Sequence, residues 1–187
     1  MSAAVPALTN FQEFKPTMFP SGVPAANYVA IDGSLPGGAI TSDDDKFAAF
    51  SNVSVFQTVH DAPWAVAFRG TLLTSTLGRF NMFGLVNAAG NHDYCVATYS
   101  TIDATKYILY TYDGQEIGTI SSMVCDDADH TFVLTFDLTR LRLYIDGVLV
   151  ASQTDLTGIT NEAVYIATGN GVSGHAKATR AAIGYAT

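Results

Sequence analysis

Charged residues are scarce in this chain of 187 residues. Asp, Glu, Lys and Arg together make up only 14% of the sequence, against roughly a quarter in an average globular domain. Lys and Arg number nine, they are scattered along the chain, and the net charge is −8. An acidic chain without a basic patch repels phosphate backbones, so we expect no nucleic-acid partner.

Long apolar runs and cysteines are also few. No apolar run approaches the roughly 18 residues that a membrane helix needs, which excludes a membrane partner of that kind. The N-terminal segment MSAAVPALTNFQEFKP has no basic stretch followed by an apolar run, so the sequence predicts no signal peptide. The two cysteines, Cys95 and Cys125, are therefore expected to be reduced thiols in a chain that folds in the cytoplasm.

What the chain does contain is typical of β-sheets. Hydrophobic residues make up 48% of it, and much of the uncharged polar remainder is Thr, Ser, Asn and Gly, which suits strands and turns. No long amphipathic helix is apparent. Turn signals recur along the chain, at NAAGN, YDGQ, CDDAD, IDGV and GNGVSG. This pattern predicts an all-β sandwich or barrel.

The segment of residues 130–151, HTFVLTFDLTRLRLYIDGVLVA, shows the alternation best. Phe132, Leu134 and Phe136 share one face of a strand, and Leu141 and Leu143 lie on one face of the next. The dipeptide at 146–147, Asp-Gly, fits a two-residue type I′ turn, in which both residues need positive φ. We interpret the segment as consecutive antiparallel strands with one face in the core.

Residues 1–26 differ from the rest because they hold four of the six prolines. Prolines spaced in this way favour extended backbone, and no strand or helix period runs through the segment. Phe11, Phe14, Met18 and Phe19 are apolar side chains that need to be covered. We expect an extended arm over 1–26 and a sandwich domain over 27–187, with the arm packed either on its own domain or on another protein subunit.

The pattern H-x-F-x-L-x-x-D-x-x-x-L-x-L-Y-x-D-G-x-L-V from His130 to Val150 resembles the concanavalin A-like lectin and glucanase superfamily, which includes laminin G-like domains. The closing segment RAAIGYAT resembles the last strand of that superfamily. The resemblance covers about residues 27–187 and implies a two-sheet antiparallel jelly roll. Its members include sugar-binding lectins, glucanases, adhesion modules and domains of virus particles.

Glucanases of this superfamily carry paired carboxylates on one strand face, where one acts as acid and the other as nucleophile. This chain has only three glutamates, Glu13, Glu116 and Glu162, and each stands alone. We therefore expect a protein that is not an enzyme, with glycoside hydrolysis as the least favoured alternative.

Two groups of residues are candidates for binding. Clustered oxygens bind calcium, and the loop candidates are Asp126, Asp127 and Asp129, although their spacing lacks the D-x-D-x-D-G pattern, so no metal or other cofactor is predicted. Aromatic side chains on a sheet face can stack on sugars or anchor a partner. The candidates for such a sugar or partner contact are Tyr107, Tyr110, Tyr112, Arg142 and Tyr144.

These observations lead to a functional hypothesis. We expect a structural or interaction protein of a virion surface, such as a bacteriophage capsid decoration protein that assembles in the host cytoplasm and docks on protein subunits through the arm and the sandwich. The alternative is a lectin-like module that binds glycans. The virion hypothesis rests on analogy within the superfamily.

Overall fold

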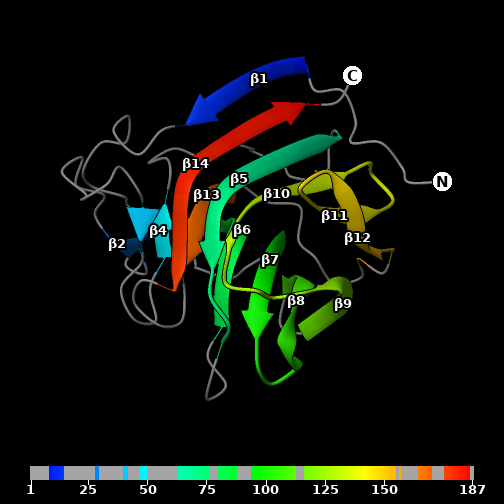
Figure 1. Cartoon of the computed structure of the whole chain (residues 1–187). Helices are drawn as coiled ribbons and strands as arrows, with labels where there is room; N and C mark the ends of the chain where they lie inside the picture. The colour runs from blue at the N-terminus through cyan, green and yellow to red at the C-terminus, as the bar shows by residue number, and fades with distance from the viewer. Residues whose placement is uncertain are drawn as a thin grey trace.

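The computed structural model is a sandwich of two β-sheets packed face to face (Figure 1). It describes residues 9–14, 28–29, 40–41, 47–49, 63–75, 80–87, 94–112, 116–154, 156, 164–169 and 175–185. Every regular element in these ranges is a strand, and no helix in them could span a membrane. The predicted all-β, two-sheet antiparallel jelly-roll sandwich is confirmed.

The first sheet, sheet A, contains seven strands in the order β1-β14-β5-β10-β11-β12, with β3 paired to β14 beside this path. Their bounds are β1 (Thr9–Phe14), β3 (Ile40–Thr41), β5 (Trp64–Leu72), β10 (Asp129–Phe136), β11 (Leu141–Ile145), β12 (Val148–Gln153) and β14 (Ala176–Tyr185). Every pair in this sheet is antiparallel.

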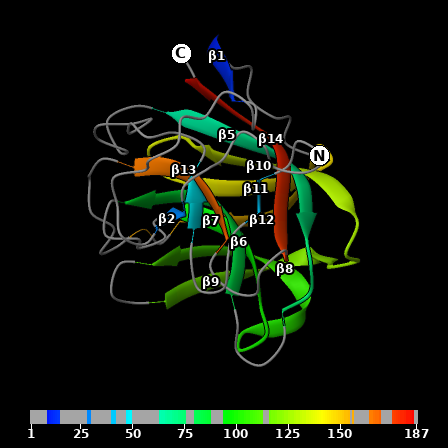
Figure 2. The same cartoon turned by 90° about the vertical axis from the view of Figure 1, so that its left-hand side faces the viewer.

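The second sheet, sheet B, also has seven strands, in the order β2-β4-β13-β6-β7-β8-β9. Their bounds are β2 (Tyr28–Val29), β4 (Phe47–Ala49), β6 (Phe80–Asn87), β7 (Tyr94–Tyr99), β8 (Asp103–Tyr112), β9 (Glu116–Val124) and β13 (Val164–Gly169). The short β2–β4 pair is parallel and the others are antiparallel. Figure 2 shows the sandwich from the side.

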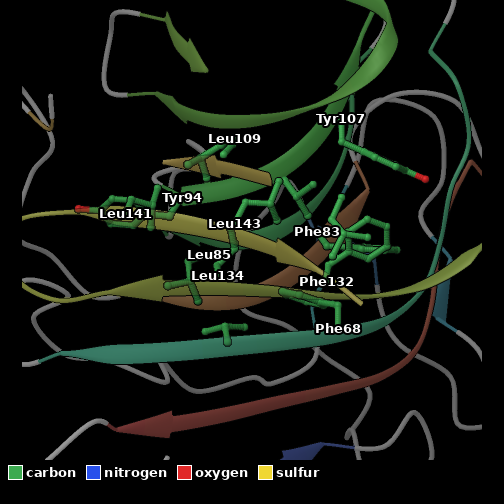
Figure 3. Packing of buried hydrophobic residues seen from close by; sticks show 14 of the residues in the cluster. Phe68, Phe83, Leu85, Tyr94, Tyr107, Leu109, Phe132, Leu134, Leu141 and Leu143 are labelled. Carbon is green, nitrogen blue, oxygen red and sulfur yellow. The ribbon is translucent and has the colours of Figure 1, made fainter. Parts of the chain in front are cut away.

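The core lies between the two sheets and follows the alternation of the sequence. The inner side chains of β10 and β11 are buried, and Phe132 packs edge-on against Phe83 and Tyr107, with ring centroids 5.5 and 5.3 Å apart (Figure 3). Removing a side chain of this size from water stabilises the fold by about 1.5–3 kcal/mol. The pattern therefore fixes which face of the β10–β11 hairpin points inward.

The pairing of β10 with β11 sets the positions of the turns on either side of β11. In the β10–β11 pair Phe132 lies opposite Ile145, and Phe136 lies opposite Leu141. The next turn places Asp146 at φ 49° and Gly147 at φ 81°. Two consecutive positive φ angles are the signature of the predicted type I′ turn, so that prediction is confirmed.

Part of the predicted arm lies within sheet A. Residues 9–14 form the edge strand β1, whose backbone pairs with β14 and places Gln12 opposite Ile183. At least this stretch packs on its own chain (Figure 1), which is one of the two alternatives left open by the sequence. The side chains of Phe11 and Phe14, and all of Met18 and Phe19, lie outside the described residues.

Candidate functional site

The loop that joins β9 to β10 is held by polar contacts of its own side chains. Asp127 has a left-handed backbone, with φ 59°, and its Oδ1 accepts hydrogen bonds from the backbone N–H and the hydroxyl of Thr74. The thiol of Cys125 donates to the carbonyl oxygen of Leu72 at 3.4 Å. These contacts tie the loop to the end of β5.

At the start of β10, His130 joins this loop to the β11–β12 turn. Its Nε2 lies 2.8 Å from Oδ1 of Asp126, and its Nδ1 lies 2.6 Å from Oδ2 of Asp146. The side chain of His130 is only 9% exposed, whereas those of the two aspartates are about half exposed. One nearly buried imidazole thus separates two carboxylates at the rim of the sandwich.

The protonation of this ring follows from its partners. An ionised carboxylate only accepts hydrogen bonds, so each ring nitrogen needs its own proton to bond both aspartates. Burial opposes the charged imidazole, but the hydrogen bonds to Asp126 and Asp146 outweigh that cost and raise the pKa of His130 above its ordinary value. The geometry is that of an imidazolium between two carboxylates.

The partners of His130 show the complementary shift. The hydrogen bond from His130 is the largest cause that lowers the pKa of Asp126. Partial burial of Asp146 opposes its ionised form, but the Thr131 N–H and His130 outweigh this and lower the pKa of Asp146. Both aspartates are therefore stabilised as acceptors.

A second ion pair lies beside this group on the outer face of sheet A. The guanidinium of Arg69 donates to Oδ2 of Asp129 from two nitrogens, at 2.9 and 2.8 Å, and Nη1 also donates to the hydroxyl of Thr131 at 3.2 Å. We call Asp126, Asp127, Asp129 and Asp146 the acidic rim.

The calcium candidates Asp126, Asp127 and Asp129 do not converge. Their carboxylates engage His130, Thr74 and Arg69 respectively. Among the described residues, no group of three His, Cys, Asp or Glu side chains surrounds a common point where a metal ion could sit. The structure places Asp126 and Asp127 in the β9–β10 loop and Asp129 at the first position of β10, and these three carboxylates form no metal centre.

The prediction that tyrosines of sheet B form an exposed contact surface needs correction. Tyr107 and Tyr110 are 0% and 1% exposed. Tyr107 belongs to the core between the sheets, and its hydroxyl points away from the neighbouring leucines (Figure 3). Tyr110 belongs to a second apolar cluster on the outer face of sheet B, where its ring lies 4.8 Å from that of Phe80. Both faces of β8 are covered at these two positions, so neither tyrosine is open to a sugar or partner.

The remaining contact candidates lie on sheet A or outside the described side chains. Tyr144 is 1% exposed and packs with Ala65 and Val133 on the outer face, so it is not an exposed contact either. Arg142 is half-buried and donates to Oδ2 of Asp137 at 2.6 Å. The side chain of Tyr112 lies outside the described residues.

The two cysteines also have defined places. Cys95 is buried in β7 and Cys125 is half-buried in the β9–β10 loop, and no disulfide joins them. Burial is the largest cause that raises the pKa of the Cys125 thiol, so it is a packing residue in its neutral form.

The contact between His130 and Asp146 is the part of the site that the sequence did not reveal. Asp146 was identified only as a turn residue, which it is. Because the backbone N–H of Asp146 donates to the Thr131 carbonyl, the turn lies directly beside the first residues of β10. The register of the β10–β11 pair was the signal that could have placed Asp146 next to His130.

Comparison with known proteins gives the fold. No family model and no curated protein sequence matches the chain. Among solved structures, the Crh5 transglycosylase in complex with NAG is similar over 99% of this chain and 88% of its own, with a TM-score of 0.54 at 14% identity. The carbohydrate recognition domain of Emp47p is similar over 98% and 91%, with a TM-score of 0.53 at 10% identity. The alginate lyase A1-II′ is similar over 92% and 99%, with a TM-score of 0.52 at 11% identity.

The chain has the concanavalin A-like jelly-roll fold. At these identities the similarity establishes the fold alone, and it agrees with the superfamily resemblance found in the sequence. The prediction that the protein is not an enzyme is contradicted, because a transglycosylase and a lyase share the fold over nearly the whole chain. The isolated position of the glutamates in the sequence was not a sufficient ground for that prediction, and their side chains lie outside the described residues.

Proposed function

We propose that this protein is a carbohydrate-binding domain of concanavalin A-like fold. The observation that carries the proposal is the fold similarity over almost the full chain to a carbohydrate recognition domain, and also to two enzymes whose names specify carbohydrate chemistry. Fold alone does not assign a function, so the proposal also needs a place on this chain where a sugar can bind.

The acidic rim supplies groups suited to sugar hydroxyls. Ionised carboxylates accept charge-assisted hydrogen bonds from hydroxyls, which are roughly twice as strong as neutral ones. Of the two carboxylate oxygens of Asp126, only Oδ1 accepts hydrogen bonds from groups in the described part of the chain. The other oxygen of this half-exposed side chain is left for a ligand, and His130 holds the carboxylate in position.

One exposed apolar side chain follows Asp146 closely in the sequence. Val148 follows the β11–β12 turn and is 58% exposed, two residues after Asp146. Sugars present hydroxyls at their edges and C–H groups on their faces, so a carboxylate beside an aliphatic side chain matches both. We infer that the rim around Asp126, Asp146 and Val148 is the binding surface.

A glycan array that includes alginates and N-acetylglucosamine oligomers tests this proposal, followed by calorimetry on the best ligand. We expect one glycan class to bind, and Asp126→Asn to weaken its affinity at least tenfold, equivalent to about 1.4 kcal/mol. The control is Asp137→Asn, which removes an acid of similar exposure at the opposite end of the β10–β11 hairpin. No binding above background across the array, or equal losses in the two variants, would reject the proposal.

The same ligands are to be tested for cleavage. Two of the similar structures are a transglycosylase and a lyase, so each glycan that binds is incubated with the purified chain and the products are analysed by mass spectrometry. Product formation that depends on the folded chain would extend the proposal from binding to catalysis on the same substrate.

The virion hypothesis has no support from the fold or the similarities, and it stays a prediction, as do its protein partners. Particle binding by the purified chain, compared with a variant in which Phe11, Phe14, Met18 and Phe19 are replaced by serine, tests it. Equal binding by the two chains would contradict a docking role for these residues.

A further inference from the structure

Two loops that are distant in the sequence meet at a single imidazole. Asp126 belongs to the β9–β10 loop and Asp146 to the β11–β12 turn, and both contact His130 at hydrogen-bond distance. The backbone N–H of Thr131 donates to Oδ1 of Asp146 at 2.9 Å, which ties the turn to β10 a second time. Movement of either loop relative to the other thus involves this group.

The number of protons on the ring decides how many loops it can hold. A neutral imidazole carries one N–H, so it can donate to only one of the two carboxylates. The other nitrogen would then direct its lone pair at a carboxylate oxygen less than 3 Å away. The ring is 9% exposed, so the lost bond is not readily replaced by water.

We propose that His130 is a pH-sensitive clasp, which joins the β9–β10 loop to the β11–β12 turn while the ring is doubly protonated and releases one of them when it loses a proton. The clasp regulates the geometry of the acidic rim. It follows from the contacts of the ring alone, so it does not rest on carbohydrate binding.

The other groups around the ring do not take over the hydrogen bond that is lost when the ring gives up its second proton. From β8, the ring of Tyr107 meets His130 edge-on, with centroids 6.1 Å apart. Burial is the largest cause that raises the pKa of Tyr107 above its ordinary value, so it stays neutral. From β5, Arg69 favours the ionised form of Asp146 while it pairs with Asp129. The groups whose shifted pKa values couple the ring to pH are therefore His130 itself, Asp126 and Asp146.

The sign of the pH dependence follows from the two directions of shift. The raised pKa of His130 gives a contribution to stability that is complete below about pH 6.5 and is lost as pH rises through its folded pKa. The lowered pKa values of Asp126 and Asp146 give a contribution that is present above about pH 3.9 and is lost as pH falls. The clasp is therefore closed in mildly acidic solution and loosens toward alkaline pH.

An NMR titration of the His130 ring nitrogens in the intact chain tests the protonation. We expect both nitrogens to be protonated at pH 5.5, with a midpoint above 6.5, and Asp126→Asn to lower that midpoint by about 1 unit or more. The matched control is Asp129→Asn, which removes the acid at the first position of β10 that contacts Arg69 instead of the ring. A wild-type midpoint at or below 6.5, or equal shifts in both variants, would overturn the proposal.

Hydrogen exchange at the Thr131 amide tests the release. After correction for intrinsic exchange, we expect its protection to fall at least threefold between pH 6 and pH 9 in the natural chain. In Asp146→Asn, which keeps an Asn-Gly pair suited to the same turn but removes the charge, we expect no such fall. Unchanged protection in the natural chain at both the Thr131 amide and the Ala128 amide, which donates to Asp126 in the other loop, would show that the ring does not act as a clasp. The same fall at Thr131 in Asp146→Asn would show this too.

Discussion

Each end of the β10–β11 hairpin is organised by an aspartate, and the two aspartates are paired with different cationic side chains. At one end, Asp137 accepts hydrogen bonds from the N–H and hydroxyl of Thr139, from the N–H of Arg140 and from the guanidinium of Arg142. At the other end, Asp146 accepts from Thr131 and from the ring of His130. Both aspartates organise a turn, but only one of them is paired with a permanent charge.

The difference determines how each end responds to pH. Arginine keeps its charge throughout the accessible range, and partial burial is outweighed by the bonds to Thr139 and Arg142, which lower the pKa of Asp137 to about 2. Its contribution to stability is present above about pH 3.9 and is lost only as pH falls through 2. The His130 end loses its contribution in both directions, so it is the responsive end of the hairpin.

The largest expected effect comes from removing a core phenylalanine beneath either end of the hairpin. Phe132 packs against His130 and Tyr107, and Phe136 packs against Trp64 and Tyr94. Either Phe→Ala change should lower the free energy of unfolding by about 3–5 kcal/mol, as measured by urea denaturation. Only Phe132→Ala should also shift the NMR signals of the His130 ring, and an equal shift in Phe136→Ala would contradict the separation.

Removing Asp137, the aspartate paired with arginine, is expected to lower the free energy of unfolding by a smaller amount. Asp137→Ala deletes the acceptor of the turn amides and the partner of Arg142, and we expect a loss of about 1 kcal/mol. Chemical denaturation of the variant and the natural chain should show the same difference at pH 5, 7 and 9, because the lowered pKa of Asp137 keeps this carboxylate ionised at all three pH values. A difference that changes with pH would mean that this end also contains a titrating group.

Each turn contains at least one residue with positive φ. Substituting one such residue in each turn is expected to change the free energy of unfolding in opposite directions. Gly147 has φ 81°, and a Cβ there would meet no atom within 4 Å, so Gly147→Ala should cost about 1 kcal/mol through backbone strain alone. Leu138 has φ 74° and is 49% exposed. Leu138→Gly should raise the free energy of unfolding by about 0.5 kcal/mol, because relief of strain exceeds the entropy cost of glycine. Thermal unfolding that shifts both variants the same way would refute this.

The smallest expected effect is the pH response of the His130 end. The free energy of unfolding should fall by about 0.5 kcal/mol more between pH 6 and pH 9 in the natural chain than in Asp146→Asn, since the aspartates are half exposed and solvent screens the pair. Parallel urea titrations at both pH values measure it. Identical pH profiles would remove the energetic distinction between the two ends.

The alternation of apolar residues along β10 and β11 predicted the fold well. It placed Phe132, Leu134 and Phe136 in the core, and the Asp-Gly pair fixed the type I′ turn, because both signals are local in sequence. A period of two separates the faces of a strand, but it does not say whether other parts of the fold cover the outer face. For that reason Tyr110 and Tyr144, which were correctly placed on a strand, were wrongly expected to be exposed.

The candidate site was predicted only in part. The acidic residues of the β9–β10 loop were evident from the sequence, but the role of Asp146 depends on contacts across β10, β11 and β12. The same is true of Asp126, Asp127 and Asp129, whose separate partners come from β5, from the segment just after it and from the start of β10. Such pairings depend on long-range register, which composition and spacing do not specify.

The proposed sugar-binding rim is tested most directly by mapping a bound glycan on the backbone amides by NMR. With the best ligand from the array, we expect chemical-shift changes concentrated at 125–131 and 145–148, while the 137–140 turn stays unchanged. Changes concentrated at the 137–140 turn, or away from both ends of the hairpin, would contradict it.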